Sequence, residues 1–499
     1  MKRILPYLAL LPVFLLLALF EADYLWTAQE HNLFLHTPLF FQQCMQVSGG
    51  LLSWAGTYLT QFFYYPMLGA GLLCLLWAFL MVLLKQAFHI RTRWLWLTLI
   101  PVGMLLLANV ELGYWIYFLK LRGHLFVASL GIIATTLLYW AFRKIRNAPL
   151  ISILFPLSTF LFYPLFGFYA LLATLLMGIS ASKARHYPSM FVALGSIILV
   201  PLLYYYALYY QTPTVNIYWT ALPIFVHNGV NDRWLNLPYV VIVLWLVAAA
   251  WRPRIRCIRP WMEATVAAAV LLAVAIGWYK DDNFHRQLTM RHQMEQQDWE
   301  GMLSTISDAK GEPTRAISMM KNLALQRLAR LSTDLNSYPD GFARPNASFP
   351  VHSVHTIGKM LYLQYGIPNY CYRWCMEDGV EYGWSTEQLK LMAKCSLLNR
   401  EMTAAQRYLS LLKMTDFHRE WAKHYEAYLH QPSLVAKDAE FQAIFPLMRD
   451  DDFLTSDQSQ LEPFLIEHLA SMTGTTPEQQ ELRSVYFKFY LKRNRYIEQ

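Results

Sequence analysis

Charged residues are scarce in this chain of 499 residues: Asp, Glu, Lys and Arg make up 15% of it, whereas hydrophobic residues make up 56%. Soluble domains usually carry about a quarter charged residues, so much of this chain must face something other than water. The scarcity is uneven, because residues 1–279 are mostly apolar and acids, bases and amides become dense from Lys280 onward. We therefore expect two domains, a multi-span membrane domain over 1–280 and a water-exposed domain over 281–499.

The usual signatures of metal and cofactor chemistry are also lacking. The six cysteines show no zinc-type spacing, and the chain has no phosphate-binding glycine loop and no Ser/His/Asp or Cys/His nucleophile signature. We therefore expect no metal site and no bound cofactor.

Two of the cysteines lie close together in the sequence. Cys371 and Cys375 are four residues apart on a predicted helix, where they share one face and are poorly placed to bridge each other. We expect free, packed thiols. A bridge from either of them to Cys395 is the alternative in an oxidising compartment.

Long apolar runs recur through the first part of the chain and predict an all-α membrane domain, since a helix needs about 20 apolar residues to cross a bilayer. The stretch 148–182 has thirty-five residues without a charge, and Pro164 and Gly167 interrupt its middle. It is too long for one span, so we expect two short spans there or a re-entrant pair. The nine expected spans cover 4–20, 62–84, 94–110, 123–142, two segments within 148–182, 189–208, 235–251 and 261–279.

The distribution of basic residues predicts the orientation of these spans. With the N-terminus inside, the inner segments hold fourteen Lys and Arg, and the short outer loops hold only Lys120, Arg122 and Arg233. The net charge of +8 is thus explained by topology, and we expect no nucleic-acid partner. We expect a multi-pass protein of a bacterial inner membrane, with the N-terminus inside and the C-terminal domain in the periplasm.

Two carboxylates, Glu21 and Asp23, mark the outer end of the first span. The first outer loop, 23–61, follows them and is rich in aromatic residues, so we expect it to lie along the membrane interface. Glu111 flanks another outer span end, where we expect its charge to cost little. For Glu21 and Asp23, a solvated helix end is the alternative to a functional site.

The domain after residue 280 contains a spacing of 34 residues. Residues 366–375 align with 400–409, with small residues at Cys371 and Ala405 and aromatic residues at Trp374 and Tyr408. This pattern resembles the tetratricopeptide repeat and implies paired helices in a short solenoid. A segment over 332–350, rich in Pro, Asn and Ser, interrupts the repeat. Such solenoids bind a protein or glycan partner in their concave face, or serve as rigid spacers or caps.

The whole chain resembles an uncharacterised family of bacterial inner-membrane proteins with a periplasmic helical-repeat tail. The stretches that carry the likeness are Phe62-Phe63-Tyr64-Tyr65-Pro66-Met67-Leu68-Gly69-Ala70, Phe162-Tyr163-Pro164-Leu165-Phe166-Gly167-Phe168-Tyr169 and Asn322-Leu323-Ala324-Leu325. This resemblance implies the architecture and no particular function.

The first third of the chain also resembles the C-type glycosyltransferases, because Glu21-Ala22-Asp23 falls where that family carries its acidic motif. The resemblance implies a polyprenyl-phosphate-sugar donor, with Asp23 or Glu21 as the general base that deprotonates an acceptor hydroxyl. Lys120, Arg122 or Arg233 would pair with the lipid phosphate, and Asp232 is the one candidate for the family's second acidic motif. The repeat tail would hold the acceptor protein or glycan.

Two further functions compete with the enzyme. One is a membrane-anchored scaffold whose repeat tail binds partner proteins of the cell envelope. The other is a transporter, which the sequence favours less, because Glu263 is the only acid within an expected span and it lies near the inner end.

Overall fold

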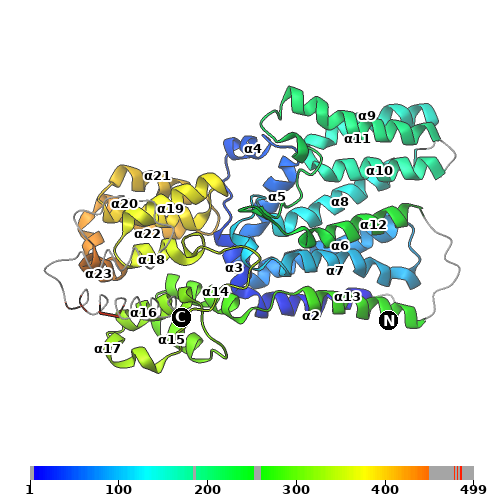
Figure 1. Ribbon diagram of the computed structural model, residues 1–499. Coiled ribbons are helices and arrows are strands. Elements are labelled where there is room, and N and C mark those ends of the chain that lie inside the picture. The colour runs from blue at the N-terminus through cyan, green and yellow to red at the C-terminus, as the bar shows by residue number, and fades with distance from the viewer. Residues whose placement is uncertain are drawn as a thin grey trace. The chain divides into compact units, whose positions relative to one another are not determined.

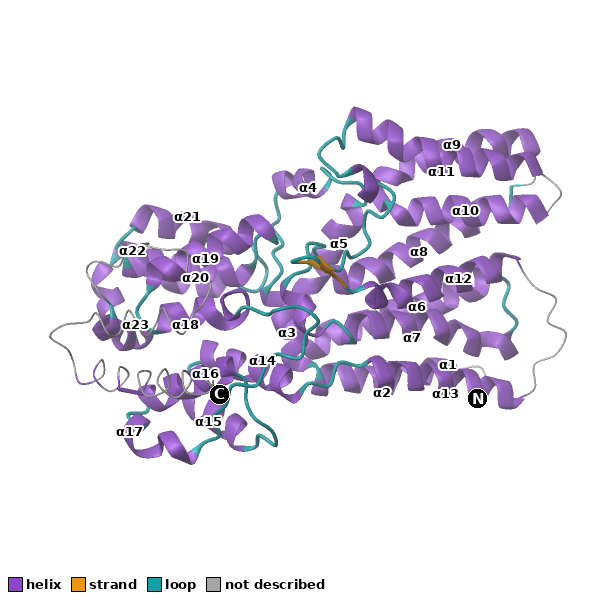
Figure 2. Cartoon of the chain, viewed as in Figure 1, coloured by secondary structure: helices purple, strands orange, loops and turns teal. Residues whose placement is uncertain are grey.

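The computed structural model describes residues 5–145, 147–183, 187–251 and 260–448, with residues 477, 480, 484 and 485 beyond them. It divides into two compact units, Met1–Tyr279 and Lys280–Gln499, which we call the membrane unit and the tail. Within the described residues, the only strands are the short β1 (Val226–His227) and β2 (Val230–Asn231), which pair with each other. The expected all-α class is confirmed (Figure 2).

The membrane unit is a bundle of long apolar helices (Figure 1). Within it, α8 packs against α6 and α10, α7 packs against α12 and α13, and α11 packs against α9 and α10. Its main helices are α1 (Leu5–Leu8), α2 (Leu10–Leu15), η1 (Leu16–Phe20), α6 (Pro66–Ala87), η3 (Thr92–Thr98), α7 (Leu99–Val110), α8 (His124–Phe142), α9 (Ala148–Phe166), α10 (Phe168–Lys183), α11 (Tyr187–Ala207), α12 (Leu237–Trp251) and α13 (Pro260–Gly277).

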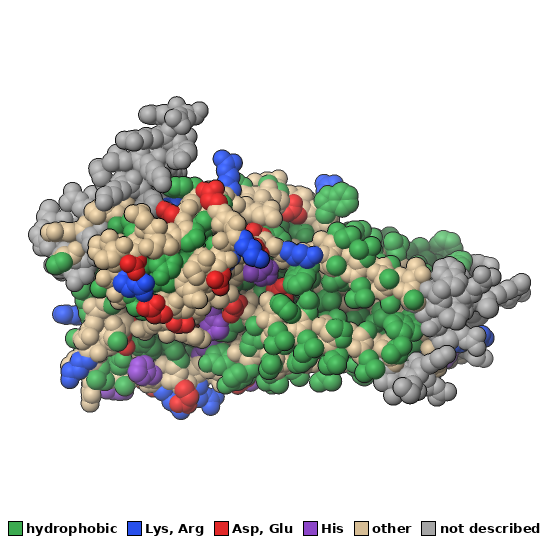
Figure 3. Space-filling view, turned by 90° about the horizontal axis from the view of Figure 1, so that it is seen from below, with side chains coloured by type: hydrophobic (Ala, Val, Ile, Leu, Met, Phe, Trp, Pro, Cys, Tyr) green, Lys and Arg blue, Asp and Glu red, His purple; other side chains and the backbone are tan. Residues whose placement is uncertain are grey.

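Several of these helices suit a bilayer. Within the described residues, four are long and apolar enough to cross a membrane, and the number rises to six if each of two bent helix pairs is one span. Figure 3 shows hydrophobic side chains over much of the visible face of the membrane unit, with few charged side chains among them. The nine expected spans each coincide with helix, but three of those helices (Trp94–Val110, Leu150–Phe166 and Phe168–Ser182) are shorter apolar helices, so the count of nine stays a prediction. The expected inner loop 252–260 lies almost entirely outside the described residues, as does the side chain of Glu263.

The uncharged stretch 148–182 forms two helices, α9 and α10, which pack against each other. The chain reverses at Gly167, whose φ of 54° suits glycine because a side chain is strained there. A Cβ at Gly167 would lie 2.7 Å from the Thr220 hydroxyl oxygen, and the N–H of Phe168 donates to the Thr220 carbonyl at 3.1 Å. The 210–236 loop therefore holds this turn in place.

The first outer loop is helical, and its expected position along the membrane interface stays a prediction. It folds into α3 (Ala22–Glu30), α4 (Pro38–Cys44), α5 (Gly50–Thr60) and η2 (Gln61–Tyr64). Every residue of α3 from Tyr24 to Glu30 is buried, and α3 packs against α6 and η2. Only α4 keeps most of its side chains exposed. In α3 the polar side chains of Gln29 and Glu30 are therefore buried together with the apolar ones.

The tail is a series of helices in which most pack against the next one along the chain. This holds from α14 to α16 and from α18 to α22. Its elements are α14 (Asp282–Glu295), α15 (Trp299–Ser307), α16 (Arg315–Arg327), α17 (Leu331–Asp334), η7 (Leu335–Ser337), η8 (Val354–Gly358), α18 (Lys359–Gln364), α19 (Pro368–Glu381), α20 (Thr386–Leu398), α21 (Met402–Leu412), α22 (Arg419–His430), η9 (Pro432–Lys437), α23 (Ala439–Ile444) and η10 (Phe445–Leu447).

Three tail helices end in the same way, with one residue in the left-handed region. These residues are Ala329 (φ 54°) after α16, Gly366 (φ 78°) after α18 and Arg400 (φ 61°) after α20. The next N–H in each case reaches back to a carbonyl five residues earlier, which closes a Schellman motif. The three bonds are Arg330 to Leu325 at 2.8 Å, Ile367 to Tyr362 at 2.8 Å and Glu401 to Ser396 at 2.7 Å. The second and third ends are separated by the expected 34 residues, as are the starts of α19 and α21.

Helix α20 is covered on all sides, because every residue from Thr386 to Leu398 is buried. Its charged side chains pair with helices that lie far away in the sequence. A repeat tail with an open α20 face would leave these charges to solvent, but here the chain's own α14 and α23 cover them. The pairs are Arg291–Glu387 at 2.9 Å, Glu295–Lys390 at 2.6 Å and Glu440–Lys394 at 2.7 Å.

The cysteines of the tail are fully buried. Cys371, Cys375 and Cys395 are free thiols, and burial raises the pKa of Cys371 and Cys375 well above the ordinary thiol value. Thiols in this state are poor nucleophiles. They act as small apolar residues where α19 meets α20.

Candidate functional site

The acidic pair of the first span lies at a bend. The π-helical turn η1 ends at Phe20, and the chain then turns by 70° into α3. Glu21 occupies the corner and its side chain is only 2% exposed. Its Oε1 accepts a hydrogen bond from the Trp278 indole N–H at 2.5 Å. Glu21 is therefore not a solvated helix end but a buried carboxylate that joins the two ends of the membrane unit.

Asp23 is placed differently. It lies in the first turn of α3 and is half-buried. A negative charge at this position is stabilised by the partial positive charge of a helix N-terminus. The next residue, Tyr24, anchors the same turn by donating from its hydroxyl to the Asn109 carbonyl at 2.8 Å.

The other predicted site residues lie on the loops between the helices. Lys120 and Arg233 are exposed, whereas Arg122 and Asp232 are half-buried. Asp232 accepts a hydrogen bond from the Trp115 indole at 2.8 Å. Burial lowers the pKa of Arg122, and the neighbouring Cys44 opposes this shift. Glu21, Asp232 and Arg122 thus lie beside three different residues, Trp278, Trp115 and Cys44.

Glu111 was expected to carry its charge at little cost, and this expectation is wrong. It follows α7 directly, and burial raises the pKa of its carboxyl to about 8. Its Oε1 is buried without a hydrogen-bond partner. The sequence carried one signal of this burial, because Glu111 is followed by a run of apolar and aromatic residues, 112–118, that forms the buried η4 (Gly113–Tyr117).

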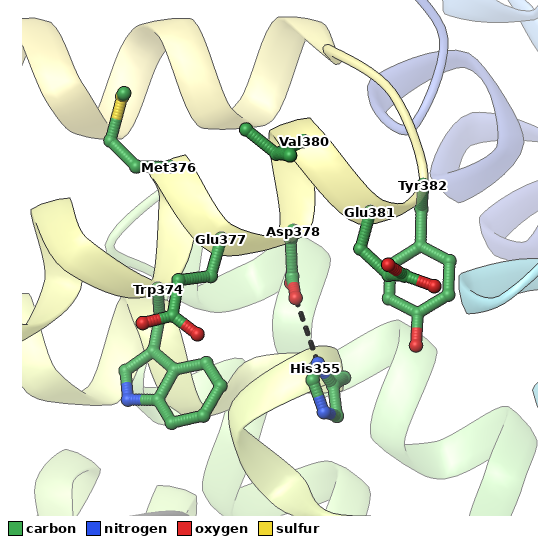
Figure 4. A pocket seen from close by; sticks show the side chains of 8 residues that line it. All are labelled: His355, Trp374, Met376, Glu377, Asp378, Val380, Glu381 and Tyr382. Carbon is green, nitrogen blue, oxygen red and sulfur yellow. Dashed lines mark hydrogen bonds and ion pairs between the residues drawn. The ribbon is translucent and has the colours of Figure 1, made fainter. Parts of the chain in front are cut away.

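A pocket of about 450 Å³ opens on the tail at the C-terminal half of α19 (Figure 4). Helix α19 begins with Pro368, whose missing N–H costs nothing in a first turn, and ends at Glu381 with Tyr382 as its C-cap. His355 comes from η8, which packs against α19. We call this concavity the α19 pocket. It is lined by His355, Trp374, Met376, Glu377, Asp378, Val380, Glu381 and Tyr382.

Three aromatic rings form the walls of the α19 pocket. The His355 ring lies between the other two, with its centroid 5.5 Å from that of Trp374 and 6.0 Å from that of Tyr382. Both contacts are nearly perpendicular, at 89° and 83°. In Figure 4 Trp374 and Tyr382 lie on opposite sides of His355. The rings therefore present surfaces in different directions around one space.

The inner end of the α19 pocket is a buried ionic cluster. The Nδ1 of His355 lies 2.8 Å from Asp378 Oδ1, and it must carry the proton because an ionised carboxylate only accepts. Lys359, itself 1% exposed, donates to the other Asp378 oxygen and to the His355 carbonyl. Burial would raise the pKa of Asp378, but the Lys359 ammonium and His355 outweigh it and lower the pKa. The Lys359 pKa is raised, because Asp378 overcomes the effect of burial.

Two more carboxylates stand at the mouth of the α19 pocket. Glu377 is exposed and pairs with Arg373 one turn earlier, at 2.9 Å. Glu381, also exposed, is close enough to the Tyr382 hydroxyl to oppose its ionisation. Negative charges are disfavoured in the last turn of a helix, where the carbonyl ends already carry partial negative charge. The end of α19 therefore has a local potential suited to a cation.

The α19 pocket was not predicted from the sequence. His355 and Asp378 lie 23 residues apart and come together only through the packing of η8 on α19. The one available signal was the density of acids and aromatic residues over 374–382. Within the described residues, no group of three or more His, Cys, Asp or Glu side chains is arranged to hold a metal ion.

Comparison with known protein families gives a match over most of the chain. The model of a family of unknown function, DUF6057, matches residues 1–475. No curated protein and no solved structure matches the chain.

Proposed function

Because the chain belongs to DUF6057, a family of unknown function, we propose a function from its own geometry: a membrane-embedded protein whose tail recognises a partner protein. This agrees with the expected membership of an uncharacterised family. The observation that carries the proposal is the α19 pocket, which combines aromatic walls with carboxylates at its mouth. Pockets with a few convergent polar groups on an aromatic lining are the usual form of a binding site.

The rest of the tail supports recognition rather than catalysis. The acid of the buried cluster, Asp378, is already paired with Lys359 and His355, so it is held as a structural ion. The face of α20 is covered, whereas the end of α19 carries an open concave surface. A rigid, preformed pocket lowers the entropic cost of binding.

Site-specific photocrosslinking in living cells tests this function. A photoreactive phenylalanine analogue would replace Val380, which lines the pocket and is 79% exposed. The matched control carries the analogue at Glu420, whose side chain is 82% exposed on α22. We expect one discrete product from the Val380 position, identified by mass spectrometry and reconstituted with purified full-length protein. The same products from both positions, or none, would refute partner recognition at this surface.

The orientation and the repeat character of the tail belong to the same proposal. Fourteen inner against three outer basic residues support an N-terminus inside and a tail outside an inner membrane. The 34-residue spacing of helix starts and ends supports a tetratricopeptide-like tail. Reporter fusions after residue 93 and after residue 448 test the orientation. Alkaline phosphatase activity at the second position alone is the expected result.

A second candidate function rests on the buried carboxylate Glu21. A desolvated acid beside the half-buried Asp23 suits a general base in a glycosyltransferase that uses a polyprenyl-phosphate sugar, with Asp23 as the base because Glu21 is bound to Trp278. Lys120, Arg122 and Arg233 would hold the lipid phosphate. Purified protein with polyprenyl-phosphate sugars, comparing wild type with Asp23→Asn and Glu21→Gln, tests it. Transfer by wild type that is unchanged in both variants would exclude these residues.

A further inference from the structure

We propose that the α19 pocket binds the cationic end of a lysine or arginine side chain of a partner polypeptide. This inference rests on the proposed function and specifies the chemistry by which the tail selects its partner.

The first argument is charge. Glu377, Asp378 and Glu381 all face the pocket from the last turns of α19, where the helix itself adds negative potential. No Lys or Arg is among the eight lining residues. Because Lys359 and His355 already pair with Asp378, the attraction for a cation comes from Glu377 and Glu381 at the mouth and from the end of the helix.

The second argument is the arrangement of rings. The rings of Trp374, His355 and Tyr382 all line the pocket, with successive centroids 5.5 Å and 6.0 Å apart. Aromatic rings attract a cation placed over their faces within about 6 Å, and tryptophan does so most strongly. Combined aromatic and acidic walls are the usual means of recognising an organic ammonium group.

The two described cations that pair with carboxylates of the pocket, Lys359 and Arg373, are not among its lining residues. Lys359 is buried behind the pocket and is bound to Asp378. Arg373 pairs with Glu377 on the surface, where the two side chains are 24% and 47% exposed. Surface pairs of this kind contribute little, so an incoming cation competes with Arg373 at small cost.

The lining favours a polypeptide side chain over a lipid headgroup. In an ethanolamine or choline lipid the ammonium group is two carbons from a phosphate, and that phosphate would meet Glu377 and Glu381. A lysine or arginine side chain instead carries an apolar stem that packs well on aromatic walls. Met376 and Val380, the two exposed apolar residues of the lining, offer contacts to the neighbouring residues of a peptide.

Isothermal titration of the detergent-solubilised, full-length protein tests the inference. The probes are N-acetyl-lysine methylamide, its arginine counterpart, and N-acetyl-Nε-acetyl-lysine methylamide, which has lost the charge. We expect binding of the first two and not the third. The double variant E377Q/E381Q is expected to weaken binding about tenfold, the scale of a lost desolvated cation contact. The variant E420Q, which removes an exposed acid on α22, is the matched control.

The outcomes separate the possible explanations. Equal binding of the acetylated probe, or equal affinity of E377Q/E381Q and E420Q, overturns cation recognition. Binding of glycerophosphoethanolamine in place of the lysine and arginine probes overturns the polypeptide assignment. If the Val380 crosslink forms equally in E377Q/E381Q, partner recognition stands and the cation inference fails. If no crosslink forms although the probes bind, the partner-protein function fails instead.

Discussion

The indole N–H of Trp278 donates a hydrogen bond to Glu21 Oε1 at 2.5 Å, across 257 residues of chain. The contact joins the end of the first helical segment to the end of α13 and closes the membrane unit. A hydrogen bond to a buried carboxylate matters most when it is removed, because the charge then keeps its desolvation cost without compensation.

Replacing Trp278 with Phe keeps a ring in place but removes this donor. We expect a loss of about 1.5–3 kcal/mol in the stability of the membrane unit, because the Glu21 carboxylate stays buried. The measurement is the Tm of the full-length protein in detergent. Glu21→Gln should cost less, since an amide oxygen still accepts. A larger loss of stability for Glu21→Gln than for Trp278→Phe would show that other contacts of the carboxylate contribute more than the bond to Trp278.

The Asp378 cluster predicts a loss of stability in acid. The folded-state pKa of Asp378 lies below its ordinary value, so its contribution is present above the unfolded pKa of about 3.9 and is lost as the pH falls through the folded value. Asp378→Asn should lower the Tm at pH 7, since breaking a buried pair costs about 3–5 kcal/mol. The Tm of this variant should also fall less steeply below pH 4 than that of the wild type. Glu420→Gln, at an exposed pair, should leave the profile unchanged. If the Tm of Asp378→Asn falls as steeply in acid as that of the wild type, other groups cause the loss of stability.

The buried carboxyl of Glu111 predicts the opposite dependence of stability on pH. Burial raises the folded-state pKa of this carboxyl to about 8, so the folded chain holds a proton that the unfolded chain releases near pH 4.3. Stability should therefore fall as the pH rises from about 5 to 8. Glu111→Gln mimics the protonated form and should make the Tm less dependent on pH over this range. The same slope in wild type and variant would exclude Glu111 as its source.

The matched helix ends of the tail allow a comparison of backbone effects. Gly366 has φ 78°, and an added Cβ would lie 2.4 Å from the Leu447 carbonyl carbon, so Gly366→Ala should destabilise by well over about 1 kcal/mol. Ala329 holds the equivalent position after α16 at φ 54°, and Ala329→Gly should stabilise by up to about 1 kcal/mol. Thermal unfolding of the full-length variants measures both. Shifts of the same sign would contradict the shared motif.

The parts of the fold that depend on local pattern could be predicted from the sequence. Apolar runs located the long helices of the membrane unit, because an uninterrupted apolar segment has few other stable forms in a bilayer. Proline and glycine predicted the division of 148–182, since Gly167 reverses the chain there. The 34-residue spacing predicted the start of α21 from that of α19.

The site depends on contacts that no local pattern contains. Glu21 looked like the edge of a hydrophobic run, and only the approach of Trp278 makes it a buried acid. Glu111 looked solvated because it follows a span, although its carboxyl and the η4 segment after it are both buried. His355 joins Asp378 through the packing of two elements whose sequences do not indicate a pair.

The ion pairs around α20 bear on how the tail responds to stress. In a simple array each helix pair touches only its neighbours, so the ends can unravel while the middle stays folded. Here Glu295 of α14 and Glu440 of α23 both bind lysines of α20, which ties these two distant helices to α20. Force applied to α14 or α23 must break an ion pair with α20. We therefore expect α14, α20 and α23 to unfold together in one cooperative step under mechanical load.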